Sequence, residues 1–272
     1  MLLCALCLAV AACATPVENV SRIAAQRQLQ EVVLPGFAGL QHQAYWKGDP
    51  NGGLLVVFID GDGSPWRGGG TRVARDPSPK HSVALQLAAS TPGSVLYLGR
   101  PCYLRFAQGL HCTNRLWTSD RYSEEVIVSM TQALRTYLRR CTRRPALVLV
   151  GYSGGGAIAS LMARELPDVT ALVTIAGNLD PETWTRLHHF LPLSNSLNPS
   201  QLPPPPSSVR QWHLVGTADT NVPYEAAKSY LERPGSGQVW RYAGFDHRCC
   251  WVREWPHAWG AIEAELADVA LR

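Results

Sequence analysis

The sequence lacks several patterns that mark well-defined classes of protein. Its uncharged apolar stretch, residues 1–13, is too short to cross a bilayer as a stable helix. No CxxC pair has zinc-ribbon spacing and no internal repeat is evident, which argues against a structural zinc site and a repeat array. Charged residues make up 17% of the chain and hydrophobic residues 46%, a globular balance rather than a disordered one. At 272 residues, one large domain is expected.

The charge pattern does not indicate a nucleic-acid-binding surface. The net charge is +4 and the basic residues are scattered, apart from a short cluster of Arg139, Arg140, Arg143 and Arg144. Cations at the end of a helix interact favourably with its dipole, so we interpret this cluster as a helix C-terminus. No nucleic-acid partner is expected.

The N-terminus differs in character from the rest of the chain. Residues 1–12 resemble a secretory signal peptide, although no Lys or Arg precedes the apolar run. The segment Val10-Ala11-Ala12-Cys13 resembles the lipobox of bacterial lipoproteins. That resemblance implies a lipid anchor on Cys13, a tether over residues 13–28, and an envelope protein attached to the membrane. Secretion without an anchor is the alternative.

Five cysteines remain if Cys4, Cys7 and Cys13 belong to the signal and the anchor. In an exported protein these five are disulfide candidates, and Cys102 with Cys112 would close a short loop. The others are Cys141 and the adjacent Cys249 and Cys250. The adjacent pair could bond to each other, or one of them could reach Cys141, so the connectivity stays open.

Short apolar runs separated by helical patterns predict βαβ units and a mostly parallel sheet flanked by helices, within a domain over residues 29–272. A helix over 122–140 is expected to have Ser119 or Asp120 as N-cap. Residues 178–208, which include the run Pro203–Pro206, predict a small lid or cap followed by an extended connector. Strands are predicted at 54–59, 95–98, 146–150, 171–175, 209–215 and 238–242, an antiparallel hairpin at 30–34 and 42–46, and further helices at 82–89, 155–165 and 257–271.

The segment Gly151-Tyr152-Ser153-Gly154-Gly155 is the strongest chemical signal. A serine nucleophile must project from a sharp turn, and small neighbours permit that turn. Here GxSxG follows an apolar strand and precedes a helical pattern, which is the context the motif requires. The alternative, a phosphate-binding loop, has neither GxGxxG nor P-loop spacing and no following Lys.

At these residues the chain resembles the α/β-hydrolase family, among serine esterases and lipases. The resemblance covers about residues 29–271 and implies a nucleophile, an acid and a histidine in that chain order. Asp219 lies after a predicted strand and matches the acid position, with Asp180 as its rival and an Asx turn as the structural alternative. His247, after the next strand, matches the general base.

The resemblance also implies two backbone N–H donors for the oxyanion. One is Gly154, directly after Ser153. The other is expected after the strand 54–59, where Asp60 stands in place of the histidine of many members and Asp62 is the expected donor. A calcium loop over residues 60–63 is the alternative, which Pro65 and a missing final Glu argue against.

The substrate is less defined. Trp66, Tyr152 and residues 103–117 are candidates for an acyl pocket or for core packing. Carboxylate or phosphate could be bound by Arg67, Arg100 or Arg105, and a metal by the pair His188 and His189 only if a third ligand existed. We expect a hydrolase of small-molecule or lipid carboxylic esters without cofactor or metal. A peptidase, a phospholipase or a non-catalytic binding lipoprotein on the same scaffold are the alternatives.

Overall fold

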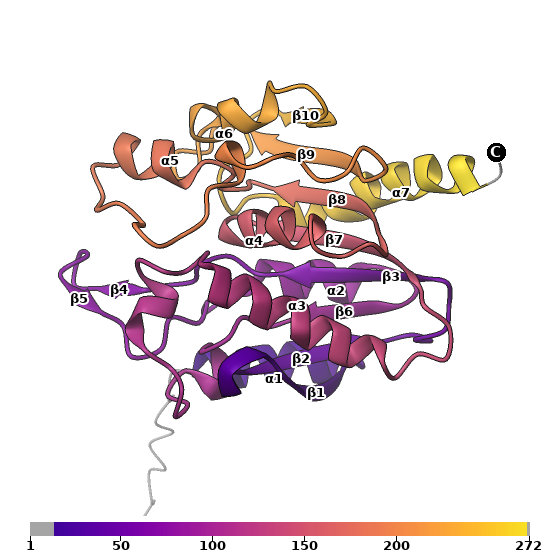
Figure 1. The fold of residues 1–272 in the computed structure, drawn as a ribbon, viewed down its shortest axis with the longest axis horizontal. Coiled ribbons are helices and arrows are strands. Elements are labelled where there is room, and N and C mark those ends of the chain that lie inside the picture. Colours follow the sequence, from indigo (N-terminus) through magenta and orange to yellow (C-terminus); the bar gives the residue numbers. More distant parts are fainter. Residues whose placement is uncertain (1–13, 271–272) are drawn as a thin grey trace, which may run out of the picture.

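The computed structural model describes residues 14–270, so the predicted signal peptide and the lipid anchor at Cys13 lie outside the described residues. An eight-stranded sheet forms the centre of the molecule (Figure 1), in the order β1-β2-β6-β3-β7-β8-β9-β10. The first two strands pair antiparallel, β2 pairs antiparallel with β6, and the remaining pairs are parallel. The strands are β1 (Gln30–Pro35), β2 (Gln41–Lys47), β3 (Leu54–Ile59), β6 (Val95–Leu98), β7 (Ala146–Tyr152), β8 (Val169–Ile175), β9 (Arg210–Gly216) and β10 (Gln238–Tyr242).

Helices cover both faces of the sheet, as the mostly parallel arrangement requires. In Figure 1, α3 and α4 lie in front of the sheet, while α2 and α7 lie behind it. The helices are α1 (Pro16–Gln26), α2 (Val83–Ser90), α3 (Glu124–Leu138), α4 (Gly154–Ala163), α5 (Pro181–Leu187), α6 (Tyr224–Leu231) and α7 (Trp251–Ala270). Four 3₁₀ turns are η1 (Phe37–Gly39), η2 (Leu104–Phe106), η3 (Asn114–Trp117) and η4 (Pro199–Gln201), and a small hairpin joins β4 (Trp66–Arg67) to β5 (Arg72–Val73).

The central strands follow directly from the sequence. Side chains of β3 and β7 are buried on both faces, as their unbroken apolar runs predict. Parallel strands end at the same edge of the sheet, so the loops after β3, β7, β9 and β10 gather there. In Figure 1 that edge is on the left, where the β4–β5 hairpin and α5 project. The predicted fold class, an α/β sheet flanked by helices, is confirmed.

Two predicted helix boundaries need correction. Helix α3 begins after Ser123, whose Oγ accepts from Val126 N, rather than after Ser119 or Asp120. The Asp120 carboxylate instead pairs with Arg115 across its own loop. Helix α7 begins at Trp251 instead of residue 257 and contains Pro256 in its interior.

The segment expected as a tether, residues 13–28, also differs from the prediction. Residues 16–26 form α1, with Thr15 as N-cap in a reciprocal capping box with Glu18. Val20 and Ala24 are fully buried, and the helix packs against α2 and β1. This part of the chain therefore belongs to the folded domain.

Residues 178–208 contain α5 and η4 joined by irregular chain. At one end, Trp184 Nε1 donates to Asn221 O at 2.7 Å, in the loop after β9. At the other, Leu197 N donates to Tyr122 O at 3.0 Å, just before α3. The segment thus joins two loops of the carboxyl edge, and its action as a lid stays a prediction. None of the helices in residues 14–270 combines the length and the apolar character needed to cross a membrane.

Candidate active site

Ser153 occupies the turn between β7 and α4. Its backbone has φ 53° and ψ −124°, a conformation that residues other than glycine rarely adopt. Neighbouring backbone holds it there, because Ser153 N donates to Ile175 O at 2.9 Å and Ser153 O accepts from Asn178 N at 3.0 Å. The turn therefore projects the Ser153 side chain from the carboxyl edge of the sheet.

The glycines of the motif are required by close packing. A Cβ atom on Gly151 would overlap the backbone of Gly155, and one on Gly155 would overlap the carbonyl oxygens of Ile59 and Asp60. Only glycine allows the strand, the turn and the end of β3 to approach this closely. The spacing of the motif is thus explained by the contact between β7, α4 and β3.

Asp219 lies in the loop between β9 and α6, with its side chain 1% exposed. Its Oδ1 accepts from the N–H groups of Asn221 and Val222 at 2.9 and 2.8 Å, which is an Asx turn. Its Oδ2 lies 2.8 Å from Nδ1 of His247. The two interpretations from the sequence, turn residue and histidine partner, therefore apply together, one to each oxygen.

His247 follows β10 and links Asp219 to Ser153. Because a carboxylate can only accept, Nδ1 carries the proton, which leaves Nε2 to accept from Ser153 Oγ at 3.0 Å. The three side chains form one hydrogen-bonded chain, although 94 residues separate Ser153 from His247. The His247 side chain is 15% exposed, so part of the imidazole is in contact with solvent.

Tyr152 braces the histidine loop, a role the sequence did not predict. Its hydroxyl donates to His247 O at 2.7 Å, and its ring lies 5.3 Å from the imidazole. Tyr152 is 7% exposed, so it is part of the packing around the site and not an open acyl-pocket wall. On the other side, Trp251 Nε1 donates to Asp246 O at 3.1 Å and ties the loop to α7.

The loop after β3 passes beside Ser153. A Cβ atom built on Gly61 would lie 2.9 Å from Ser153 Cβ and 3.4 Å from Ser153 Oγ. The N–H of Asp62 donates to no acceptor among residues 14–270. Gly154 is the first residue of α4, so its N–H has no acceptor within its helix. Both expected oxyanion donors are therefore near the nucleophile and free of intrahelical or loop partners.

The carboxylate of Asp62 is held in a buried cluster of opposite charge. Its Oδ1 accepts from Arg100 Nη1 at 2.6 Å, and its Oδ2 accepts from Arg121 Nη1 at 3.0 Å and from the Tyr122 hydroxyl at 2.6 Å. Burial by itself raises the pKa of Asp62, but Arg121 and Arg100 outweigh it and hold the pKa at about 2. A calcium loop at residues 60–63 does not fit, because this carboxylate is already paired with cations.

Asp60 differs from Asp62 in having no cation beside it. Burial raises its pKa, against the hydrogen bonds it accepts from Ser82, Gly61 and Tyr97. The side chain points into the protein between β3 and β6, and Tyr97 donates to its Oδ2 at 3.4 Å. Asp60 therefore stabilises the base of the loop.

Asp180, the rival acid, is not near His247. It caps α5, where its carboxylate accepts from Thr183 N at 3.1 Å, Asn198 Nδ2 at 2.9 Å and Ser229 Oγ at 2.6 Å. Burial raises its pKa, but the hydrogen bonds, with Ser229 first among them, lower it overall. Geometry thus favours Asp219 as the partner of His247.

The predicted anion-binding arginines separate into different roles. Arg100 is 2% exposed and committed to Asp62, so it is unavailable to a ligand. Arg105 pairs with Glu31 at 2.6 Å, and Arg67 is exposed in β4. Trp66, also in β4, is 39% exposed and stays a candidate for substrate contact. In residues 103–117, Trp117 is buried, with Nε1 donating to Ala74 O at 3.1 Å, which favours core packing there.

The histidine pair does not form a metal site. His188 lies 2.8 Å from Asn221 O and stacks on Phe190, with ring centroids 5.2 Å apart. Within residues 14–270, no three side chains of the metal-ligating types come together.

Disulfides connect two of the cysteine pairs. Cys102 bonds to Cys112, as the sequence suggested, with the Cα atoms 5.5 Å apart. The adjacent Cys249 and Cys250 bond to each other, and the partly buried Cys141 bonds to no other cysteine of residues 14–270. The second pair lies on the loop that also carries His247.

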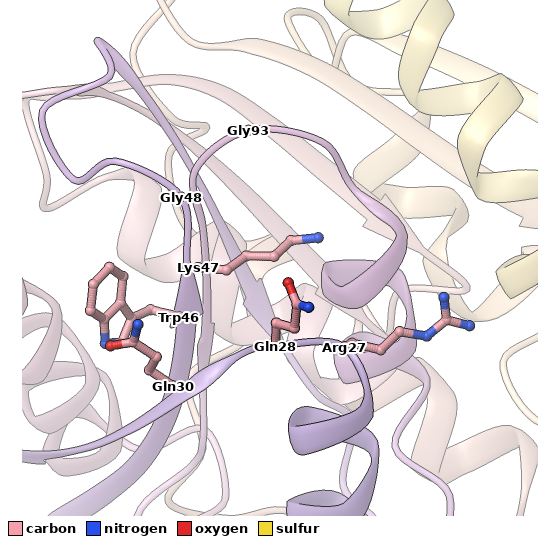
Figure 2. Close-up of a pocket in the computed structure, with 7 residues that line it drawn as sticks. All are labelled: Arg27, Gln28, Gln30, Trp46, Lys47, Gly48 and Gly93. Atoms are coloured by element: carbon pink, nitrogen blue, oxygen red, sulfur yellow. The ribbon is translucent and has the colours of Figure 1, made fainter.

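A surface pocket of about 530 Å³ lies away from these residues. It is formed where β1 and β2 meet the turn before β6, at the edge of the sheet opposite Ser153. In Figure 2, Trp46 and Lys47 point to opposite sides of their strand, so the side chains around the pocket do not converge. Lys47 Nζ donates to Ala89 O at 2.8 Å, so this ammonium group is already hydrogen-bonded within the protein.

Comparisons with known proteins support the architecture. No protein-family model matches the chain, and no curated protein matches its sequence. Among solved structures, it resembles an α/β serine hydrolase without a lid from Xanthomonas campestris, at 15% identity and TM-score 0.53, over 88% of this chain and 94% of that one. An esterase from Pyrococcus furiosus matches at 14% identity and TM-score 0.59, over 87% of this chain and 90% of that one. A puromycin-hydrolyzing peptidase from Mycobacterium tuberculosis matches at 15% identity and TM-score 0.55, over 80% of this chain but 36% of that one. At these identities the likeness establishes the α/β-hydrolase fold.

Proposed function

We propose that the chain is a serine hydrolase that cleaves carboxylic esters, with Ser153 as nucleophile, His247 as general base and Asp219 as the orienting acid. The observation that carries the proposal is the hydrogen-bonded chain from Ser153 Oγ to His247 Nε2 at 3.0 Å and from His247 Nδ1 to Asp219 Oδ2 at 2.8 Å. The esterases and hydrolases among the proteins of similar fold support the same class of reaction.

The acylation step uses each residue once. Ser153 Oγ attacks the ester carbonyl carbon while its proton passes to His247 Nε2, and Asp219 stabilises the imidazolium. The carbonyl oxygen becomes an oxyanion that accepts from the N–H groups of Gly154 and Asp62. When the tetrahedral intermediate collapses, the C–O bond to the alcohol breaks and the alcohol leaves with the proton from His247.

Deacylation repeats the sequence with water. His247 takes a proton from the water, the hydroxide attacks the acyl carbon, and the proton returns to Ser153 Oγ as the carboxylic acid leaves. No cofactor or metal enters the scheme. We infer small or medium acyl groups. Two aromatic candidates for the wall of an acyl pocket, Tyr152 and Trp117, are instead hydrogen-bonded within the protein, to the histidine loop and to the core.

A fluorophosphonate probe and a series of p-nitrophenyl esters of increasing acyl length test this proposal. We expect covalent labelling and hydrolysis by the wild-type protein, and loss of both in Ser153→Ala. Folded wild-type protein that is neither labelled nor active would favour the alternative, a non-catalytic binding lipoprotein. Activity on peptide or phospholipid substrates but not on soluble esters would favour a peptidase or a phospholipase.

We further propose that the protein is exported and anchored through Cys13, which would place its ester substrates in the bacterial envelope. The support is the apolar segment 1–12 and the small residues before Cys13. Metabolic labelling with palmitate should mark the wild-type protein and not Cys13→Ala. A mature protein that begins elsewhere and carries no lipid would favour plain secretion.

A further inference from the structure

The loop that carries one proposed oxyanion donor has no regular structure of its own. Asp62 lies in the irregular chain after β3, where no ladder of backbone hydrogen bonds sets the direction of its N–H. An oxyanion hole stabilises the transition state only if its donors are aimed before the reaction begins. Something outside this loop must therefore fix the position of the Asp62 peptide.

Two neighbouring segments donate hydrogen bonds to Asp62 from different sides. From the segment after β6, Arg100 Nη1 contacts Oδ1 at 2.6 Å and the Tyr103 hydroxyl donates to Asp62 O at 3.1 Å. From the segment before α3, Arg121 Nη1 and the Tyr122 hydroxyl contact Oδ2 at 3.0 and 2.6 Å. Both the carboxylate and the carbonyl of Asp62 are thus held, which leaves its N–H as its remaining polar group.

The two segments are themselves tied into the fold. Arg100 Nη2 donates to Arg121 O at 2.9 Å, which joins one segment to the other. The disulfide between Cys102 and Cys112 closes the loop that contains Tyr103. The cluster is therefore a connected unit and not a set of separate surface contacts.

The cluster contains more positive charge than the Asp62 carboxylate needs to be neutralised. The side chains of Arg100, Arg121 and Asp62 are 1%, 5% and 14% exposed, so two cations share one buried carboxylate. Arg100 Nε has no partner among residues 14–270. Burying a second guanidinium without a second carboxylate is costly, so stability alone is a poor explanation for it.

The cluster also touches the other donor. A Cβ atom on Gly154 would overlap Asp62 Oδ1, so the carboxylate packs against the peptide that follows Ser153. We propose that Arg100, Arg121 and Tyr122 are positioning residues, which act through the Asp62 carboxylate to aim the Asp62 N–H at the oxyanion. This inference rests on the proposed function and concerns the same site.

Single substitutions separate positioning from a merely structural role. Tyr122→Phe removes one hydrogen bond without changing the charge, Arg121→Gln removes a hydrogen bond and a cation, and Arg121→Lys restores the cation. We expect kcat on a p-nitrophenyl ester to fall by roughly 10- to 100-fold in Tyr122→Phe and Arg121→Gln, with KM changed less than about threefold. Arg121→Lys should recover part of the loss.

A trifluoromethyl ketone provides a second readout, because it adds to the serine and places an oxyanion in the hole. Its inhibition constant should rise by the same factor as kcat falls. The matched control is Tyr230→Phe, since Tyr230 is also fully buried and hydrogen-bonded, to Gln211 and Ser160, but lies in α6. Tyr230→Phe should lower the melting temperature without changing kcat or the inhibition constant.

Each outcome bears on one proposal. If Tyr122→Phe and Arg121→Gln lower only the melting temperature, as the control does, or raise only KM, the positioning role is overturned while the hydrolase stands. If the wild-type protein shows neither Ser153-dependent hydrolysis nor inhibition by the ketone, the proposed function fails and the positioning role fails with it.

Discussion

At Asp219, one carboxylate serves two neighbours. Oδ1 closes a turn onto the backbone of Asn221 and Val222, while Oδ2 faces His247. The turn fixes the carboxylate before any substrate binds, so the histidine is oriented by a rigid partner. A local motif of the sequence and a long-range contact thereby combine in a single residue.

Replacement of this acid separates it from its rival. Asp219→Asn keeps the shape of the side chain but removes the carboxylate charge, so we expect kcat to fall by about 10³ to 10⁴ with the fold retained. Asp180→Asn should leave kcat within about threefold while lowering the melting temperature, because Asp180 caps α5. Steady-state ester hydrolysis and thermal melts measure both. The reverse pattern of activities would assign the acid to Asp180.

Two buried histidines outside the site use both ring nitrogens in neutral form. His42 contacts Gly99 O and Ser129 Oγ, and His213 contacts Ser236 O and Thr174 Oγ1. Burial lowers the pKa of each histidine from 6.5 to about 4. Between these values the unfolded chain binds protons that the folded protein does not.

Stability should therefore fall as the pH drops from about 6.5 to about 4. One pKa unit corresponds to about 1.4 kcal/mol, so each histidine accounts for up to about 3 kcal/mol of this loss. Urea unfolding at pH 7.5 and pH 4.5 should show a smaller acid-induced loss in His213→Gln than in the wild-type protein. Asp60, whose pKa burial raises, acts in the opposite direction but is common to both proteins. Equal losses in the two proteins would contradict the assignment.

At the scale of elements, loops carry the candidate chemistry and strands position it. The loops after β3, β7, β9 and β10 supply Asp62, Ser153, Asp219 and His247. Side chains braced by neighbouring loops hold them in place, as with Tyr152 and the histidine loop. The disulfide between Cys102 and Cys112 belongs to the same bracing.

Removal of that disulfide tests its contribution. The bond has a sequence separation of 10 residues, and loop entropy predicts a stabilisation of about 2–3 kcal/mol. The double variant Cys102→Ser, Cys112→Ser should show that loss in urea unfolding. Cys249→Ser with Cys250→Ser is the control, because adjacent cysteines enclose no loop of the unfolded chain. A similar loss of stability in both double variants would contradict the loop-entropy explanation.

At the scale of the whole molecule, the folded domain begins earlier than the sequence pattern indicated. Val20 and Ala24 of α1 are buried against the rest of the protein, and the Ser21 hydroxyl lies 3.0 Å from that of Tyr45. Burial of one valine side chain is worth about 1.5–3 kcal/mol. The helix is therefore expected to contribute measurably to the stability of the whole domain.

Truncation locates this boundary. A chain that starts at residue 29 should melt roughly 5–10 °C lower than one that starts at residue 14, because it loses α1. Thermal melts followed by circular dichroism measure both. Equal melting temperatures for the two truncated chains would show that α1 acts only as a tether.

The sequence predicted the central elements well and some boundaries poorly. Strands β3, β7, β8 and β9 were predicted within about two residues, because short unbroken apolar runs between turn residues are typical of buried strands. The start of α7 was missed, although Trp251, Trp255 and Trp259 share one buried face, because local preferences disfavour a helix with a proline such as Pro256 in its interior. The helix α1 was missed because its short amphipathic pattern follows directly on a predicted signal peptide.

By itself, the sequence determined the sheet and the serine turn, because these depend on local patterns. The family resemblance and its chain order added His247 and two candidates for the acid. Only the tertiary structure decided between Asp219 and Asp180, since both follow a strand and only one reaches His247. It alone revealed the buried cluster around Asp62, because Arg100 and Tyr122 lie 38 and 60 residues away in the chain. Contacts across such separations depend on where loops meet at the edge of the sheet, and no local pattern records that meeting.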